Sequence, residues 1–229
     1  MASRFVFFPT SAESSSLVES KLVEFQWVPG LSISQGTKSV LNLHSVIRHQ
    51  IGIENILEIS TRSPERLGIS LSAFNLQVLV NSSKVSVEAA YQSSKVFQGG
   101  GPYLDLLAGS SMDAKQDMRL KSSGDLLEFQ FEDVRWPLTS NPNFYDYLYV
   151  RGLFNHPDKN RLLEFDAFTD IAYSQNTLQK SNAKSHNCQA RSAAIYCSLL
   201  RRMPEVEALA YLKNQSKKIE SHSEQLGLF

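Results

Sequence analysis

The segment that most constrains the fold lies between residues 76 and 95, where strand-like sequence passes directly into helical sequence. Leu76–Val80 and Lys84–Val87 are β-type runs on either side of the turn residues Asn81-Ser82-Ser83, a pattern that predicts a β-hairpin. Val87–Lys95 follows with no linker and reads as a helix. A hairpin that runs straight into a helix is typical of a domain in which sheet and helix share one core.

The remainder of the chain continues the same mixture of short strands and helices. Leu22–Val28 alternates with period two at its centre and ends at Pro29-Gly30, and Leu126–Phe131 alternates in the same way, so both predict strands. Helices are predicted at residues 38–51, after the cap-like Ser63-Pro64, from Ser110, at 143–154 and at 187–202. With no internal repeat, these elements predict one helix-rich α+β domain with a small sheet.

Composition is that of an ordinary soluble globular protein. Of the 229 residues, 42% are hydrophobic and 20% are charged, and no apolar run approaches the ~18 residues of a membrane span. The N-terminus lacks a signal-like apolar region with a cleavage site, so we expect a cytoplasmic protein. The cysteines, Cys188 and Cys197, are too few for a disulfide framework or a tetrahedral metal site, and we expect them to be reduced.

The charge balance gives no global sign of a nucleic-acid binder, because the formal net charge is zero. Basic residues nevertheless outnumber acidic ones between Lys180 and Lys218. This bias could meet phosphates, or it could form the solvated side of a terminal helix.

The predicted helix at residues 87–95 carries a polar stripe. Glu88, Gln92 and Lys95 stand at i, i+4 and i+7, which places an acid, an amide and a base on one helix face. Tyr91 borders the stripe, and the alanines beside it would let a ligand approach closely. Such a stripe suits a site that grips sugar hydroxyls and a glycosidic bond. The alternative is an exposed helix with a solvated Glu/Lys pair.

Three further polar groups have two interpretations each. Phe165–Asp170 brackets two carboxylates with aromatic residues, which could raise a carboxyl pKa for general acid work or could cap a helix. Asn187 and Arg191, at i and i+4 of a helix start, could seat a pyrophosphate or form an ordinary cap. Gly99-Gly100-Gly101 could let the backbone approach a phosphate or could simply stop the preceding helix.

The usual catalytic signatures are missing from the sequence. It has no G-x-S-x-G, no H-E-x-x-H, no C-x-x-C and no kinase set, and its histidines have no partners at metal-ligand spacing. We therefore expect no metal.

Taken together, these segments resemble the NADAR domains, a class that includes N-glycosidases acting on ADP-ribose linked to bases or nucleotides. The resemblance rests on an acid-x-x-Tyr-Gln-x-x-Lys pattern and several shorter matches. These are Glu88, Tyr91, Gln92 and Lys95, the preceding Leu71-Ser72-Ala73-Phe74-Asn75, the aromatic Trp136, Asp170 and the helix start at Asn187. The resemblance implies the NADAR fold.

One branch of these domains is more similar still, the antitoxins encoded beside toxins that ADP-ribosylate guanine in DNA. The segments that resemble it are Tyr91–Lys95 through Gly99–Tyr103, Phe144-Tyr145-Asp146, Asp166–Asp170 and Asn187–Ala193, and the likeness covers roughly residues 4–202. It implies that residues 71–202 form the catalytic core, that 1–70 pack on the same domain, and that 203–229 form a polar tail. Expected partners are ADP-ribosylated DNA, ADP-ribose and, functionally, the cognate toxin.

The resemblance implies hydrolysis of the N-glycosidic bond between the ribose of ADP-ribose and a guanine nitrogen. Such a bond breaks with oxocarbenium character, which a nearby carboxylate stabilises. Glu88 is expected to bind the ribose hydroxyls and the developing charge, and Asp170 to be the second acid or base. Lys95 could open the ribose as an imine that water then releases. No cofactor is required.

The expected substrate-binding residues have three tasks, which are to orient the sugar, to hold phosphate and to stack on a base. Gln92 and Asn187 are expected to orient the sugar. Phosphate would be held by Arg191 or by the turn of Gly99, Gly100 and Gly101. The base would stack on Tyr91, Phe74 or Trp136, and Asn75, which follows Phe74 in the sequence, would also contact the substrate.

Two other functions remain open from the sequence. The first is an N-glycosidase acting on small nucleotide or riboflavin-pathway intermediates. The second is a non-catalytic module that binds ADP-ribose or the toxin itself, although pure binding does not need an acid, an amide and a lysine on one helix.

Overall fold

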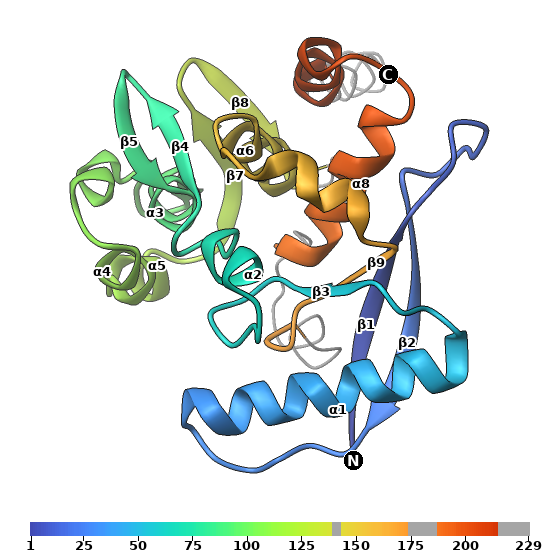
Figure 1. The fold of residues 1–229 in the computed structure, drawn as a ribbon. Coiled ribbons are helices and arrows are strands. Elements are labelled where there is room, and N and C mark those ends of the chain that lie inside the picture. The colour runs from blue at the N-terminus through green and yellow to red at the C-terminus, as the bar shows by residue number, and fades with distance from the viewer. Residues whose placement is uncertain (139–142, 174–186, 215–229) are drawn as a thin grey trace, which may run out of the picture.

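The computed structural model describes residues 1–138, 143–173 and 187–214 (Figure 1). Its strands are β1 (Ala2–Pro9), β2 (Val18–Phe25), β3 (Ile56–Glu58), β4 (Gln77–Val80), β5 (Ser83–Ser86), β6 (Lys95–Phe97), β7 (Leu126–Phe131), β8 (Val134–Pro137) and β9 (Ala167–Thr169). Its helices are α1 (Ile33–Ile51), α2 (Arg66–Ser70), α3 (Val87–Ser93), α4 (Ser111–Gln116), α5 (Arg119–Ser122), α6 (Phe144–Phe154) and α8 (Gln189–Leu200), with 3-10 segments η1 (Leu104–Ala108) and η2 (Lys159–Glu164).

The α+β class is confirmed, but the described strands form three small sheets where one was predicted. Their strand orders are β2-β1-β9-β3, β4-β5 and β6-β7-β8. In the first sheet β1 is antiparallel to both β2 and β9, whereas β3 and β9 run parallel. The parallel pair places the ends of two strands that are distant in sequence next to each other.

Helices cover both faces of the four-stranded sheet, as Figure 1 shows for α1 and α8. Successive strand residues point to opposite faces of the sheet, so a single strand contributes side chains to two cores. One face contributes Val6, Ile56 and Ala167 to a core shared with α1, and the other contributes Phe7, Leu57 and Phe168 to the larger core that contains α8. This double coverage holds the ends of β3 and β9 in fixed positions.

The predicted hairpin is confirmed as β4 and β5, and α3 follows β5 directly. Asn81 and Ser82 take positive φ angles of 46° and 66° at the two-residue turn, the left-handed conformation that such hairpins need. Ser86 then caps α3 by accepting a hydrogen bond from the Ala89 N–H at 3.1 Å.

The prediction that one helix extends to Lys95 is wrong, because α3 ends at Ser93 and Lys95 begins strand β6. The hydroxyls of Ser93 and Ser94 both donate to the Ala90 carbonyl oxygen, at 3.0 and 2.6 Å, and so compete with helical hydrogen bonding. Lys95 pairs instead with Phe129 of β7.

Several other predicted boundaries move by a few residues. The strand predicted at 22–28 is β2 and ends at Phe25, α1 starts at Ile33, and α2 starts at Arg66 with Glu65 rather than Ser63 as its N-cap. Helix α8 starts at Gln189, so Asn187 precedes it. The predicted elements at Ser110, 126–131 and 143–154 are confirmed as α4, β7 and α6.

Cys188 and Cys197 are free and buried, as predicted. Residues 205–214 are helical, and their Ala208 and Leu212 side chains join the larger core. Within the three described ranges, no helix has both the length and the apolar character needed to cross a membrane. The basic residues Lys180, Lys184, Lys217 and Lys218 lie outside the described residues.

Candidate functional site

A cavity of about 380 Å³ lies where β3 and β9 end side by side. Its lining includes residues that follow each strand, such as Ser60 and Asp170. Residues from α3, α4, α6 and the start of α8 complete the wall. The carboxyl ends of neighbouring parallel strands are a usual position for ligand sites, and this volume falls in the range of small-molecule pockets.

Glu88 lines this cavity from the first turn of α3 and is only 6% exposed. Its Oε1 accepts a hydrogen bond from Gln92 Nε2 at 2.9 Å and lies 3.8 Å from Lys115 Nζ of α4. The backbone N–H of Glu88 donates to the Ala73 carbonyl at 2.9 Å, which fixes the start of the helix. Glu88 therefore faces the cavity with Gln92 hydrogen-bonded behind it, so Glu88 is not part of a solvated Glu/Lys pair on an exposed helix.

Asp170 lines the same cavity directly after β9 and is also 6% exposed. Burial raises its pKa to about 6, although hydrogen bonds from the Ala172 N–H and the Gln189 side chain act in the opposite direction. Gln189 also accepts from the Ala73 N–H at 2.7 Å. The amide therefore ties Asp170 to the segment that anchors α3, so the two carboxyls are held by one hydrogen-bonded frame.

Glu58 is a further buried carboxyl that interacts with Asp170, and no sequence pattern pointed to it. It is 1% exposed, and it accepts hydrogen bonds from Ser60 Oγ at 2.6 Å, Thr169 Oγ1 at 2.6 Å and the Ile171 N–H at 2.9 Å. Burial, together with the charge of Asp170, raises its pKa to about 8 despite these donors. Glu58 and Asp170 thus form an interacting pair, of which Asp170 lines the cavity, and the raised pKa values favour holding a proton near neutral pH.

His44 of α1 extends this buried network. Its Nε2 lies 2.9 Å from Thr169 Oγ1, and burial lowers the pKa of the imidazole to about 4. A neutral His44 can either donate to Thr169 or accept from it, so the hydroxyl can match either protonation state of Glu58.

Lys95 is not among the residues that line the cavity. Its Nζ stands 4.9 Å from the centre of the Tyr91 ring. Burial lowers the pKa of the ammonium group to about 8, with Glu88 raising it and Lys115 lowering it further. A lysine with this pKa is partly uncharged at neutral pH, which a nucleophilic amine requires.

Four of the residues expected to bind or act on substrate line the cavity together, namely Glu88, Asp170, Phe74 and Asn187. Gln92 supports Glu88 from the next turn of α3, as described above. Tyr91 packs against Phe129 and Tyr145 with ring centroids 5.2 and 5.1 Å apart. It therefore stands in the core behind the cavity.

The structure places the remaining expected residues outside this cavity. Trp136 is 1% exposed and stacks on Tyr147 with ring centroids 4.8 Å apart, and the partly buried Arg191 guanidinium pairs with Asp146. The Gly99-Gly100-Gly101 turn packs on β6, where a Cβ at Gly101 would lie 2.2 Å from the Lys95 carbonyl oxygen. Asn75 is exposed and lines a different hollow.

The cavity also contains residues that the sequence did not single out, among them Lys115, Tyr145, Gln189 and Arg62. Tyr145 and Gln189 fall inside segments that resemble the antitoxin branch, so a signal for them existed. Tyr145 is 3% exposed, and its hydroxyl makes no hydrogen bond with any described residue. Burial and the charge of Glu88 raise its pKa, so the phenol keeps its proton for donation to a ligand. Lys115 has no distinguishing local pattern.

A second hollow, of about 440 Å³, lies between the β4 region and the end of α6. Lys84 and His156 are among its lining residues, but no aspartate or glutamate is. A reaction that needs carboxyl groups is therefore better supported in the first cavity than in this hollow. Across the described parts of the chain, no group of three or more histidine, cysteine, aspartate or glutamate side chains could hold a metal ion.

Comparison with known proteins gives one family match. The family model of the DarT1-associated NADAR antitoxins matches residues 2–225, nearly the whole chain. The search of curated proteins found no match to this chain. A match of this extent, together with the α+β fold and the enclosed polar site on α3, shows that the chain belongs to the DarT1-associated NADAR antitoxins.

Proposed function

We propose that this antitoxin is an N-glycosidase that removes ADP-ribose from guanine in DNA and so reverses the product of its cognate toxin. The observation that carries the proposal is the pair of buried carboxyls, Glu88 and Asp170, which come from separate elements and line one cavity. A protein that only bound ADP-ribose would have no need to bury two acids at the sugar, since each costs desolvation energy.

Glu88 is suited to stabilise positive charge on the ribose. Its carboxylate is held by Gln92 and Lys115 and shielded from bulk water. The glycosidic bond breaks with oxocarbenium character, and a fixed carboxylate in a water-poor site stabilises that charge more than water does.

Asp170 is suited to supply the proton that the leaving guanine nitrogen needs. Its raised pKa of about 6 keeps a fraction of the carboxyl protonated near neutral pH. Water then adds its hydroxyl to the ribose anomeric carbon and returns its proton to Asp170, which completes the hydrolysis.

Lys95 offers a covalent route to the same products. Its neutral amine would attack the anomeric carbon as guanine leaves, and ring opening would give an imine that water hydrolyses to free ADP-ribose. The lowered pKa of Lys95 and the charge of Glu88 acting on it support this role, and the route requires the Lys95 side chain to turn toward the cavity that it does not line in this structure.

The test is release of ADP-ribose from a guanine-modified oligonucleotide by the purified protein. Glu88→Gln and Lys95→Ala should each lower the rate at least ~10²-fold, the usual contribution of one acid, base or nucleophile. Trapping with borohydride should label Lys95 if the imine forms. Normal turnover by both variants would refute the assignment.

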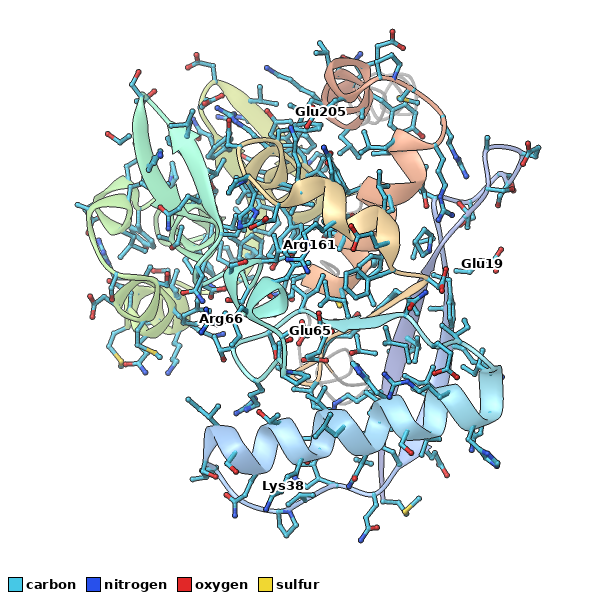
Figure 2. All side chains as sticks on the ribbon, in the orientation of Figure 1. Glu19, Lys38, Glu65, Arg66, Arg161 and Glu205 are labelled. Atoms are coloured by element: carbon cyan, nitrogen blue, oxygen red, sulfur yellow. The ribbon has the colours of Figure 1, made fainter. Side chains whose placement is uncertain are left out.

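Matched controls are available on the surface. Glu19→Gln on β2 and Lys38→Ala on α1 remove the same charges at exposed positions that do not line the cavity, and should leave the rate unchanged (Figure 2). Faster turnover of modified free nucleotide than of oligonucleotide would favour the small-molecule alternative. A stable toxin complex without any release of ADP-ribose would favour a non-catalytic antitoxin.

A further inference from the structure

Arg62 is a cation of the cavity whose charge no described carboxylate neutralises. It lines the cavity from the loop that follows β3, and it forms no ion pair within the described residues. The other nearby basic residues are engaged, since Lys115 pairs with Glu88 and Arg191 with Asp146. Arg4 donates through Nε to the Ile171 carbonyl at 2.6 Å. Among these basic residues, Arg62 is the one whose guanidinium donors make no hydrogen bond or ion pair with a described residue, so they are available to a ligand.

The backbone of Arg62 is fixed on both sides. Its N–H donates to Ser60 Oγ at 3.1 Å, and its carbonyl oxygen accepts from Thr37 Oγ1 of α1 at 3.0 Å. Ser60 in turn donates to the buried Glu58 carboxyl. The position from which the Arg62 side chain starts is therefore set by the same network that surrounds Asp170.

The side chain of Arg62 is also given room by a glycine in α1. Gly36 is buried, and a Cβ at this position would lie 2.2 Å from Arg62 Cδ and 2.9 Å from Cγ. Glycine inside a helix is unfavourable relative to alanine, yet the φ angle of Gly36 does not require it. The need for glycine here is explained by the Arg62 stem lying across the helix at that point.

We propose that Arg62 binds the pyrophosphate of ADP-ribose, an inference that rests on the proposed function. A guanidinium presents a planar fork of donors that matches phosphate oxygens, and an arginine with no carboxylate partner keeps that fork available. The cavity then has one part for the sugar, at Glu88 and Asp170, and another for the anionic group. This replaces Arg191 and the Gly99-Gly100-Gly101 turn, which lie outside the cavity, as the phosphate-binding element.

The experiment measures binding of ADP-ribose, adenosine and inorganic pyrophosphate by calorimetry. Arg62→Ala should weaken ADP-ribose binding by about 10- to 100-fold, the range for a charge-assisted hydrogen-bonded contact, and should abolish pyrophosphate binding. Adenosine carries no phosphate, so its affinity should stay the same. Raising the salt concentration should weaken ADP-ribose binding to the wild type more than to the variant.

Two further variants separate position from charge. Gly36→Ala keeps Arg62 but pushes its stem, so it should weaken ADP-ribose binding while the thermal unfolding midpoint stays the same or rises. Arg66→Ala removes the same charge four residues later, at an exposed position on α2, and should bind ADP-ribose as the wild type does (Figure 2). Wild-type affinity in Gly36→Ala would overturn the role given to that contact.

The outcomes keep this inference apart from the proposed reaction. If Arg62→Ala binds and turns over as the wild type does, the anion site is wrong and the reaction stands. If the wild type binds ADP-ribose in an Arg62-dependent way but releases none from modified guanine, the anion site stands and the reaction is wrong. A wild type that binds no ADP-ribose would overturn the anion site, and the release of ADP-ribose from modified guanine would still decide the reaction.

Discussion

Replacing Glu58 by glutamine should remove a stability penalty that grows with pH. Burial and the neighbouring Asp170 carboxyl raise the pKa of Glu58 from its ordinary value of 4.5 to about 8. Between these two values the folded protein binds a proton that the unfolded chain has already released. Because the native state binds more protons there, the free energy of unfolding falls as the pH rises through this window.

The size of the effect follows from the two pKa values. A pKa difference between 4.5 and about 8, at about 1.4 kcal/mol per pH unit, gives a loss on the order of 4 kcal/mol between pH 5 and pH 9. Glutamine has nearly the same shape and never ionises. Its oxygen can accept from Ile171 N–H and Ser60, and its NH₂ can donate to Thr169 Oγ1, which can then donate to His44. The variant should therefore fold at pH 5.

The assay is urea unfolding of the wild type and of Glu58→Gln at pH 5, 7 and 9. The quantity of interest is the change in unfolding free energy from pH 5 to pH 9, compared between the two proteins, because any pH-independent packing loss cancels. The wild type should lose several kcal/mol more than the variant, and Glu19→Gln, at an exposed site on β2, should behave as the wild type does. A difference below about 1 kcal/mol would mean that Glu58 ionises as an exposed carboxyl does, and the reasoning about the buried pair would fail.

Two further predictions concern the site and the core. The kcat/KM of the wild type on ADP-ribosylated guanine should fall as the pH rises through about 6, because Asp170 must be protonated to act as an acid. This inflection should vanish in Asp170→Asn. An unchanged pH profile in the variant would contradict the acid role. Trp136→Ala should lower the free energy of unfolding by about 3–5 kcal/mol, because the indole is fully buried against Tyr147, while the rate of the folded protein stays within a few-fold of the wild type. A large loss of rate without a loss of stability would instead assign Trp136 to base stacking.

Elements whose signals are local were predictable from the sequence. The hairpin was predicted from the β-type runs on either side of Asn81-Ser82-Ser83. The predicted α4 and α6 are held locally by capping boxes at Ser110 and Asn143, where each cap bonds a residue only three positions away. The polar face of Glu88 and Gln92 was likewise readable, because one turn of helix relates them. In each case the interacting groups lie within about four residues of one another.

Features that depend on contacts between distant parts of the chain could not be predicted from local sequence patterns. Lys95 was expected on the helix, but pairing with Phe129, 34 positions later, took it into a strand. Local propensity for a short helix is weak compared with the hydrogen bonds and burial that a strand partner offers.

The amino-acid sequence by itself determined the α+β class, the hairpin that leads into α3, the family, and the chemical character of Glu88 and Asp170. Only the tertiary structure decided that the Glu58 and Asp170 carboxyls interact and that Gly36 makes room for Arg62. The reason is physical. Burial and neighbouring charges set the pKa of a carboxyl and decide whether an arginine is left without an ion-pair partner. These surroundings come from strands and helices that are distant in the sequence.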